Sequence, residues 1–241
     1  MKVYGLPALA AILLTACSQG EAPPEPKPSL AATDAPPAIP VMGPERRIIA
    51  FGDSLFAGYG LNAGEGYPAM LEAALRAQGI NARLIDGAVS GDTTAAGLQR
   101  LAFLLDSQPD KPELVLISLG GNDMLRGLSP QQTRENLDAI LTELDKRGIR
   151  AVLMGMLAAP NLGADYRRAF DPIYPALAKK HDAALVPFFM QPLMDRPDRV
   201  LPDRIHPTAT GVEAMVAATV DTVREALPPV AILPPVTSPP Q

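Results

Sequence analysis

Three side chains in this sequence could together activate a hydroxyl group as a nucleophile, although they lie far apart in the chain. Ser54 stands directly after a short apolar run, within Gly52-Asp53-Ser54-Leu55. Asp203 and His206 lie three positions apart near the other end. On a tight loop, that offset lets the carboxylate accept Nδ1–H of the imidazole, which leaves Nε2 free to act as a base. Taken singly, Ser54 also fits a helix N-cap and His206 an ordinary surface histidine, so the hypothesis depends on the fold.

Two glycine-containing segments could supply donors for a negatively charged oxygen beside such a nucleophile. In Ser90-Gly91-Asp92-Thr93, Gly91 has no side chain to shield its N–H group, which could face a ligand oxygen. In Gly120-Gly121-Asn122-Asp123, the Asn122 side chain offers an amide donor. Each segment alone also fits a plain turn, where Gly, Asn and Asp are common. His181, the other histidine, follows two lysines at an expected helix end and is interpreted as an ordinary surface residue.

Short apolar runs alternate with helical patterns, and this alternation predicts the scaffold for these residues. The runs are apolar at successive positions, which is typical of strands covered on both faces in a parallel sheet. They comprise residues 48–51, 84–85, 114–117, 151–154 and 185–186 leading to 188–189. Between them lies helical spacing, as after Ser129-Pro130, where an N-cap and a first-position proline open a helix that Gly148 is placed to end. We therefore expect a five-stranded parallel sheet in a three-layer α/β/α sandwich, with ligands bound at the carboxyl ends of the strands.

The composition restricts the class of function and the domain organisation. The 241 residues carry a formal net charge of −5 and no run of Lys or Arg, which argues against nucleic acid as the main partner. Two histidines and one cysteine are too few for a typical zinc site, so no metal is expected. Of the 27 prolines, eight lie in residues 21–44 and six in residues 228–241. We predict a Pro-rich tether at residues 17–44, one globular domain at 45–227 and a Pro-rich disordered tail at 228–241.

The first residues resemble an export signal of the lipoprotein type, which we assign to residues 1–16. Lys2 gives a minimal positive charge, and the apolar run from Leu6 to Leu14 is too short to span a membrane but suits a secretory signal. Leu14-Thr15-Ala16-Cys17 resembles a bacterial lipobox, in which cleavage leaves Cys17 as a lipid-modified N-terminus. The residue after Cys17 is Ser18 rather than Asp. By the usual sorting pattern of lipoproteins, we therefore expect a lipoprotein of the outer membrane, facing the periplasm. The alternative is an ordinary signal peptide and a soluble periplasmic protein.

Taken in order, the four polar segments resemble blocks one, two, three and five of the SGNH (GDSL-type) hydrolase family, whose fold is flavodoxin-like. The resemblance implies that Ser54 attacks an acyl carbonyl, His206 takes its proton and Asp203 orients the imidazole. It also implies that the oxyanion is bound by the N–H groups of Ser54 and Gly91 and by the Asn122 amide, without a metal or organic cofactor. Over residues 46–226 the chain resembles the bacterial subgroup of acyl-CoA thioesterase I, lysophospholipase and arylesterase. The strings that carry this resemblance are Gly97-Leu98-Gln99-Arg100-Leu101, Leu125-Arg126-Gly127, Ile173-Tyr174-Pro175 and Val186-Pro187-Phe188-Phe189-Met190.

The same resemblance points to carboxylic esters as substrates. In that subgroup the loop after the fourth strand flanks the acyl groove, and here this loop contains Leu157, Ala158, Pro160 and Leu162. Its small apolar residues suit an aliphatic or aryl acyl group, with thioesters and lysophospholipids as further candidate substrates. A hydrophobic lid without selectivity is the alternative. We expect a monomer that contacts the membrane only through a lipid at Cys17.

Three other functions fit parts of the sequence. An O-acetylesterase acting on envelope or extracellular polysaccharide is one, although the chain has 5% aromatic residues and no Trp with which to stack on sugars. A non-enzymatic lipoprotein could keep the fold for binding, but every expected catalytic position is filled. A nucleotide-binding domain is suggested by Gly58, Gly60 and Gly64, yet their spacing is not that of G-x-G-x-x-G and they begin beyond Ser54. A flexible loop beside the active site is the better interpretation of these glycines.

Overall fold

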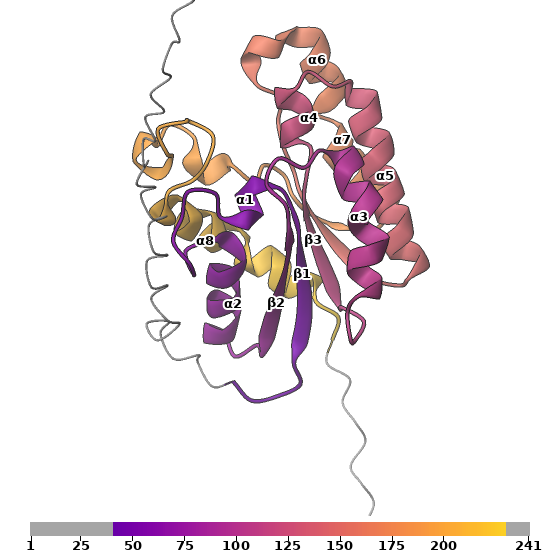
Figure 1. Ribbon diagram of the computed structural model, residues 1–241, viewed down its shortest axis with the longest axis vertical. Coiled ribbons are helices and arrows are strands. Elements are labelled where there is room, and N and C mark those ends of the chain that lie inside the picture. Colours follow the sequence, from indigo (N-terminus) through magenta and orange to yellow (C-terminus); the bar gives the residue numbers. More distant parts are fainter. Residues whose placement is uncertain (1–40, 230–241) are drawn as a thin grey trace, which may run out of the picture. The chain divides into compact units, whose positions relative to one another are not determined.

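The computed structural model describes residues 41–229, and a parallel sheet lies at the centre of this part of the chain. Its five strands are hydrogen-bonded in the order β2-β1-β3-β4-β5 (Figure 1). The strands are β1 (Arg46–Gly52), β2 (Ala82–Ala88), β3 (Leu114–Ser118), β4 (Arg150–Met154) and β5 (Ala184–Val186). This is the flavodoxin-like strand order, and it confirms the predicted sheet.

Helices cover both faces of the sheet and complete the predicted three layers. On one face α2 packs against α8, and on the other α3 packs against α5, with α7 beside α5, β4 and β5 (Figure 1). The helices of these two layers are α2 (Tyr67–Ala77), α3 (Thr94–Asp106), α5 (Pro130–Lys146), α7 (Ile173–Lys180) and α8 (Ala209–Ala226). Other elements connect them: α1 (Ser54–Ala57), α4 (Gly121–Leu125), α6 (Gly163–Phe170) and the 3-10 turns η1 (Pro160–Leu162), η2 (Gln191–Leu193) and η3 (Pro197–Arg199).

The unbroken apolar runs are explained by burial on both faces of the inner strands. β3 is buried throughout, and β1 is buried except at Arg47. Each fully buried Val, Leu, Ile or Phe side chain stabilises the fold by roughly 1.5–3 kcal/mol relative to exposure. The last run forms a shorter strand than predicted, because Pro187 has no N–H to donate and β5 ends at Val186. Phe189 is nevertheless buried, and its N–H donates to the Gly155 carbonyl at 2.8 Å.

The signals at the ends of α5 act as the sequence predicts. Ser129 is the N-cap, and its Oγ accepts the Gln132 N–H at 3.2 Å, while Pro130 occupies the first helical position. The helix ends at Lys146, and Gly148 follows with φ 60°, a backbone conformation that glycine adopts without a steric penalty. Because α5 ends where the sequence predicts, the position at which β4 can begin is set as well.

The strand order places a crevice at the carboxyl edge of the sheet. From β1 the chain moves outward to β2, and then crosses back over β1 to form β3. The loops that leave β1 and β3 therefore diverge, which is the usual position of a ligand site in an open α/β sheet. Ser54 follows β1 and Asn122 follows β3, so both stand at this point.

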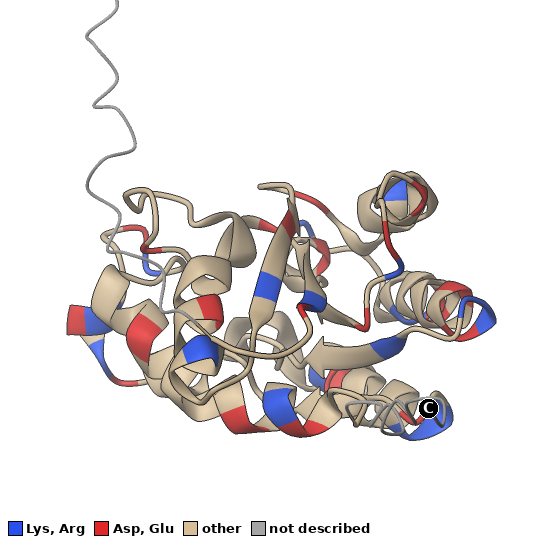
Figure 2. Ribbon diagram, turned by 90° about the horizontal axis from the view of Figure 1, so that it is seen from below, with Lys and Arg blue, Asp and Glu red and all other residues tan. Residues whose placement is uncertain are grey.

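At the opposite edge, where the strands begin, charged residues of both signs are interspersed (Figure 2). Arg46 Nε donates to Glu113 Oε2 at 2.7 Å and ties the start of β1 to the segment before β3. Within residues 41–229, no helix combines the length and the apolar character needed to cross a membrane. The predicted signal at 1–16, Cys17 and most of the tether lie outside the described residues, as does the tail from residue 230.

His181 is not the surface residue that its sequence context indicates. Its side chain is only 5% exposed, because the end of α7 packs on α5. Nδ1 lies 2.5 Å from Asp145 Oδ2, and Nε2 lies 2.7 Å from Asp138 Oδ1. Burial lowers the pKa of His181, but the hydrogen bonds to the two carboxylates outweigh it and raise the pKa above its usual value.

We expect His181→Gln to lower the thermal unfolding midpoint more at about pH 6 than at about pH 9. A raised folded-state pKa gives stability that is fully present below the unfolded pKa, about 6.5, and is lost as pH rises through the folded pKa. A loss of about 2 kcal/mol at the lower pH corresponds to a shift of roughly 4–8 °C. Lys180→Gln, which removes a more exposed partner of Asp138, is the control and should cost at most about 1 kcal/mol. Equal destabilisation of His181→Gln at both pH values would contradict the prediction.

Candidate active site

Ser54 lies at the carboxyl edge of the sheet, at the first position of α1. β1 ends at Gly52, where an added Cβ would stand only 2.8 Å from the Ser118 carbonyl oxygen, so glycine permits the close approach. Asp53 caps α1, because its Oδ1 accepts the Leu55 N–H at 3.1 Å. The capping role that the sequence allowed for Ser54 is therefore taken by its neighbour, and the Ser54 hydroxyl is left for another partner.

That partner is His206, which the structure brings next to both Ser54 and Asp203. Ser54 Oγ lies 2.8 Å from His206 Nε2, and His206 Nδ1 lies 2.6 Å from Asp203 Oδ2. The loop between Asp203 and His206 is tight, since the Leu201 N–H donates to the His206 carbonyl at 2.7 Å. In this arrangement an imidazole can accept the proton of a hydroxyl that attacks an electrophile.

Hydrogen bonds to the loop keep Asp203 ionised. Its pKa is lowered to about 2, first by the His206 N–H, then by the imidazole and by the Ile205 N–H. The two backbone groups donate to Oδ1 at 3.0 and 2.9 Å, while Oδ2 faces the imidazole. At neutral pH the carboxylate can hold Nδ1–H and stabilise an imidazolium.

Asp53 has the opposite electrostatic environment, although it is adjacent to Ser54. Burial raises the pKa of Asp53 to about 6, against the opposing effects of the Leu55 N–H, the nearby His206 and the Asn122 amide. Only 2% of the residue is exposed. Asp53 therefore changes its charge within the ordinary working range of pH, directly behind Asn122.

Gly91 and Asn122 lie on the same cavity as Ser54. Gly91 has φ 86°, a conformation that residues with a side chain rarely adopt. Asn122 Nδ2 donates to the Asp92 carbonyl at 3.0 Å and to Asp53 Oδ2 at 3.2 Å. Both N–H groups of the amide thus have acceptors. An oxyanion formed at Ser54 would share the N–H group that now donates to Asp53, or would replace Asp53 as its acceptor.

A buried network holds Asn122 from behind. Asp123, fully buried, accepts the Thr94 N–H at 2.8 Å and the Thr94 hydroxyl at 2.5 Å. The Thr133 hydroxyl donates to the same carboxylate at 3.3 Å. These bonds join α4 to α3 and α5, so the Asn122 side chain is carried by a rigid support rather than by a free loop.

Arg100 connects the loops on the other side of the site, which the sequence did not predict. Its Nε donates to Asp92 Oδ2 at 2.6 Å, Nη1 to the Gly87 carbonyl at 2.6 Å and Nη2 to the Gly52 carbonyl at 3.1 Å. The guanidinium also lies 4.3 Å from the centre of the Phe51 ring. One side chain therefore ties the carboxyl ends of β1 and β2 to the loop that carries the predicted glycine donor.

We expect Arg100→Lys to lower kcat about tenfold and to change KM little. Lysine keeps the charge but not the planar set of donors, and losing about 1–1.5 kcal/mol of hydrogen bonding would loosen the loop that carries the predicted oxyanion donor Gly91. Initial rates with p-nitrophenyl butyrate measure this. Arg147→Lys is the matched control, because Arg147 donates to Asp106 and Glu143 on the opposite edge and has similar exposure. An equal fall in kcat for both variants would show a general loss of stability instead of a positioning role for Arg100.

A mostly apolar cavity of about 730 Å³ opens beside Ser54 and His206. Its volume falls within the range of roughly 300–1,000 Å³ that is usual for small-molecule sites. Flexible apolar side chains form much of its wall and suit ligands of variable shape. These are Met124, Met156, Phe188, Met190 and Met194.

The predicted substrate loop supplies part of this wall. Leu157, Ala158 and Pro160 line the cavity, but Leu162 does not. Leu162 ends the turn η1, from which α6 leads the chain away. The methionines were missed because they come from separate segments, and single apolar residues at strand and helix ends are also expected in a core.

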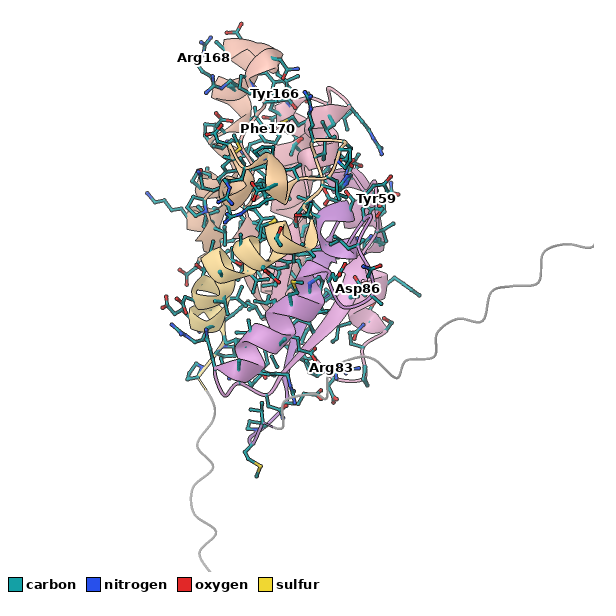
Figure 3. All side chains as sticks on the ribbon, turned by 90° about the vertical axis from the view of Figure 1, so that its left-hand side faces the viewer. Tyr59, Arg83, Asp86, Tyr166, Arg168 and Phe170 are labelled. Atoms are coloured by element: carbon teal, nitrogen blue, oxygen red, sulfur yellow. The ribbon has the colours of Figure 1, made fainter. Side chains whose placement is uncertain are left out.

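Tyr59 covers the imidazole of His206, a contact that the sequence did not predict. The two ring centroids are 4.4 Å apart, and Tyr59 is 54% exposed. Tyr59 lies beyond the carboxyl end of β2, farther than Asp86 in the direction in which this strand runs (Figure 3). Gly58 and Gly60, on either side, have φ 71° and 75°, so the glycines interpreted as a flexible loop form the turn that places Tyr59. An aromatic residue between two glycines shortly after Ser54 was the available signal.

Comparison with known proteins places this geometry in a family. Residues 50–214 match the GDSL-like Lipase/Acylhydrolase family. The arylesterase of Vibrio mimicus is 38% identical over 161 residues, which cover 67% of this chain and 80% of that protein. The thioesterase 1/protease 1/lysophospholipase L1 of Escherichia coli K12 is 39% identical over 160 residues, 66% of this chain and 74% of that protein. The crystal structure of AlinE4, an SGNH-hydrolase family esterase, is 64% identical with a TM-score of 0.66, and the match covers 78% of this chain and all of that one.

The family match spans the segments that carry Ser54, Gly91, Asn122, Asp203 and His206. The relatives are named as enzymes that cleave esters or thioesters, which rules out both the nucleotide-binding and the non-enzymatic alternatives. This chain therefore belongs to the GDSL-like lipase/acylhydrolase (SGNH) family and is an ester hydrolase.

Proposed function

We propose that this hydrolase cleaves carboxylic esters of aliphatic or aryl acids, through an acyl-enzyme formed on Ser54. The observation that carries the proposal is the 2.8 Å contact between Ser54 Oγ and His206 Nε2, which both line a large apolar cavity. Thioesters and lysophospholipids are further substrates of this proposal, because the same attack on an acyl carbonyl releases a thiol from a thioester or a glycerophosphodiester from a lysophospholipid.

The proposed reaction uses the groups in the order in which they are placed. Ser54 Oγ attacks the carbonyl carbon while His206 Nε2 takes the proton, and Asp203 holds the resulting imidazolium. The N–H groups of Ser54 and Gly91 and the Asn122 amide bind the oxyanion. His206 then protonates the leaving alcohol or thiol, and water repeats the steps on the acyl-enzyme to release the acid.

The cavity wall favours acyl groups longer than acetyl. An acetyl group reaches little beyond the carbonyl, whereas a longer chain would contact Met124, Met156 and Met190. Each additional buried methylene contributes about 0.8 kcal/mol, which is about fourfold in kcat/KM when the contact persists in the transition state. This supports acyl or aryl esters over the acetylated sugars of an O-acetylesterase.

A panel of p-nitrophenyl esters tests the substrate proposal. From acetyl to octanoyl we expect kcat/KM to rise by about 10- to 1,000-fold, since part of the gain per methylene is lost to imperfect packing. The same panel in acyl-CoA thioesters measures the thioester activity. A preference for acetyl over every longer acyl group would reject the proposal and support the O-acetylesterase.

We also propose that the protein is exported as a monomeric lipoprotein, with a lipid on Cys17 and residues 17–44 as its tether. The N-terminal pattern supports this proposal, with its lone Cys after a short apolar run. Mass spectrometry of the native N-terminus tests it. A mature chain that begins after a different cleavage site, or at Cys17 without added mass, would leave the soluble periplasmic alternative.

A further inference from the structure

Most of the exposed large hydrophobic side chains of the described residues lie on or next to the active-site cavity. Eight such residues are exposed, and five of them line the cavity, while Val89 immediately precedes the lining residue Ser90. We call these six residues the apolar rim: Tyr59, Val89, Leu125, Leu157, Met194 and Ile205. Their exposed fractions range from 37% at Ile205 to 58% at Leu125. The other two, Met42 and Phe103, lie outside the cavity.

Each residue of the apolar rim comes from a different segment at the carboxyl edge of the sheet. Five lie in loops, which follow α1, β2, β4 and η2 or stand directly before His206, and Leu125 is the last residue of α4. Single exposed apolar residues are normal on a protein surface, but a gathered set marks a contact surface. Because separate segments each present one such side chain, the composition of a single segment does not explain the apolar rim.

The position of the apolar rim indicates that its partner is a lipid layer rather than a second protein. A second protein seated on it would cover the cavity and block the substrate from reaching Ser54. A layer of acyl chains would bury the same side chains and still let an ester move from the layer into the apolar cavity. Charges of both signs flank the apolar rim. Arg126 follows Leu125, Arg204 precedes Ile205 and lines the cavity, and Asp195 follows Met194. This mixture of signs favours zwitterionic over strongly charged head groups.

We propose that the apolar rim docks the catalytic domain on the surface of a zwitterionic phospholipid bilayer, with the cavity open toward the acyl chains. The inference rests on the proposed function, because it concerns how an amphiphilic ester reaches the same site. The tether predicted at residues 17–44 permits this orientation even though it joins β1 at the opposite edge of the sheet. Fully extended, it could span up to roughly 90 Å, against about 23 Å for a strand of seven residues.

Vesicle binding without turnover tests the proposal. The protein is the chain from Ser18 to Gln241 with Ser54→Ala, which omits the predicted signal and Cys17 and keeps the whole domain with its own core. It is sedimented with phosphatidylcholine vesicles. We expect binding, and we expect Leu125→Ser combined with Met194→Ser to lower the partition coefficient at least about tenfold. Phe103→Ser, which removes a 78% exposed aromatic residue near the far end of α3, should leave it unchanged.

A fluorescence measurement gives a second reading that does not depend on weakening the apolar rim. The chain contains no Trp, so Leu125→Trp introduces a single indole at the apolar rim and Phe103→Trp places one elsewhere. We expect the emission of Leu125→Trp alone to shift to shorter wavelength with vesicles and to be quenched by brominated acyl chains. The proposal would be overturned if the protein does not bind vesicles, or if the Leu125→Ser/Met194→Ser and Phe103→Ser variants partition equally. Equal emission shifts of Leu125→Trp and Phe103→Trp would also overturn it. A concentration-dependent dimer lost in the Leu125/Met194 variant, without vesicle binding, would assign the apolar rim to a second copy.

The failure of this inference is separable from a failure of the proposed function. Hydrolysis of p-nitrophenyl butyrate below its aggregation limit, by the same chain with Ser54 intact, reports the reaction alone. Activity on this soluble ester without vesicle binding would reject the docking surface and leave the ester hydrolase intact. Loss of both would instead reject the proposed reaction.

Discussion

Ser54→Ala is expected to lower the hydrolysis of p-nitrophenyl esters by about 10⁶-fold in kcat while leaving the domain folded. The variant removes the oxygen that would form the acyl-enzyme, and the remaining oxyanion donors cannot replace it. The fold should persist, because Asp53 rather than Ser54 caps α1 and, within residues 41–229, the Ser54 side chain is hydrogen-bonded only to His206. Burst kinetics with p-nitrophenyl butyrate and thermal unfolding measure the two parts of the prediction.

Covalent labelling identifies the nucleophile independently of turnover. A fluorophosphonate should add one mass increment to the natural chain and none to Ser54→Ala. Ser90→Ala is the matched control, because Ser90 lines the same cavity but has no imidazole partner among the described residues, and this variant should still be labelled. Labelling of Ser54→Ala, or turnover within about a hundredfold of the natural chain, would reject Ser54 as the nucleophile.

The second large effect is expected from Asp203→Asn, which should lower kcat by about 10⁴-fold. The new side chain can still accept the N–H groups of Ile205 and His206 with its oxygen, so the loop keeps its shape. Its amide, however, presents N–H groups to Nδ1, which favours the tautomer with the proton on Nε2. That imidazole cannot take the Ser54 proton. Steady-state kinetics over the full ester panel measure the loss.

The pH dependence of stability separates this electrostatic role from a packing role. Because the pKa of Asp203 is lowered to about 2, its contribution to stability is present above the unfolded value, about 3.9, and is lost as pH falls through 2. The difference in unfolding midpoint between the natural chain and Asp203→Asn should therefore be constant above about pH 5 and shrink below about pH 4. Asp198→Asn removes an exposed carboxylate that pairs with Arg196 in the same segment, and it should change kcat by no more than about twofold. A tenfold or smaller effect of Asp203→Asn on kcat would contradict the assignment.

The fold was predictable because its signals are local and repeated. Unbroken apolar runs at 48–51 and 114–117 become inner strands that are buried on both faces, and the Ser129-Pro130 signal begins α5. One prediction failed for a local reason, because Pro187 shortened β5. The other failed for a non-local reason, because the two carboxylates that surround His181 come from a helix about 40 positions earlier in the chain.

The sequence by itself determined the class of enzyme and the residues proposed to act in it. Asp203 and His206 are neighbours along the chain, and Ser54, Gly91 and Asn122 each follow a strand of a parallel sheet, whose carboxyl ends necessarily meet at one edge.

Only the tertiary structure decided how these residues are held and what surrounds them. It buries Asp53 and raises its pKa, and it ties the carboxyl ends of β1 and β2 to the loop after β2 through Arg100. It also places Tyr59 on His206 and leaves Leu162 out of the cavity lining. Finally, it gathers the apolar rim from six separate segments. Each of these features depends on the distance between residues remote in the chain, and such a distance is set by the packing of layers, which no local pattern of residues encodes.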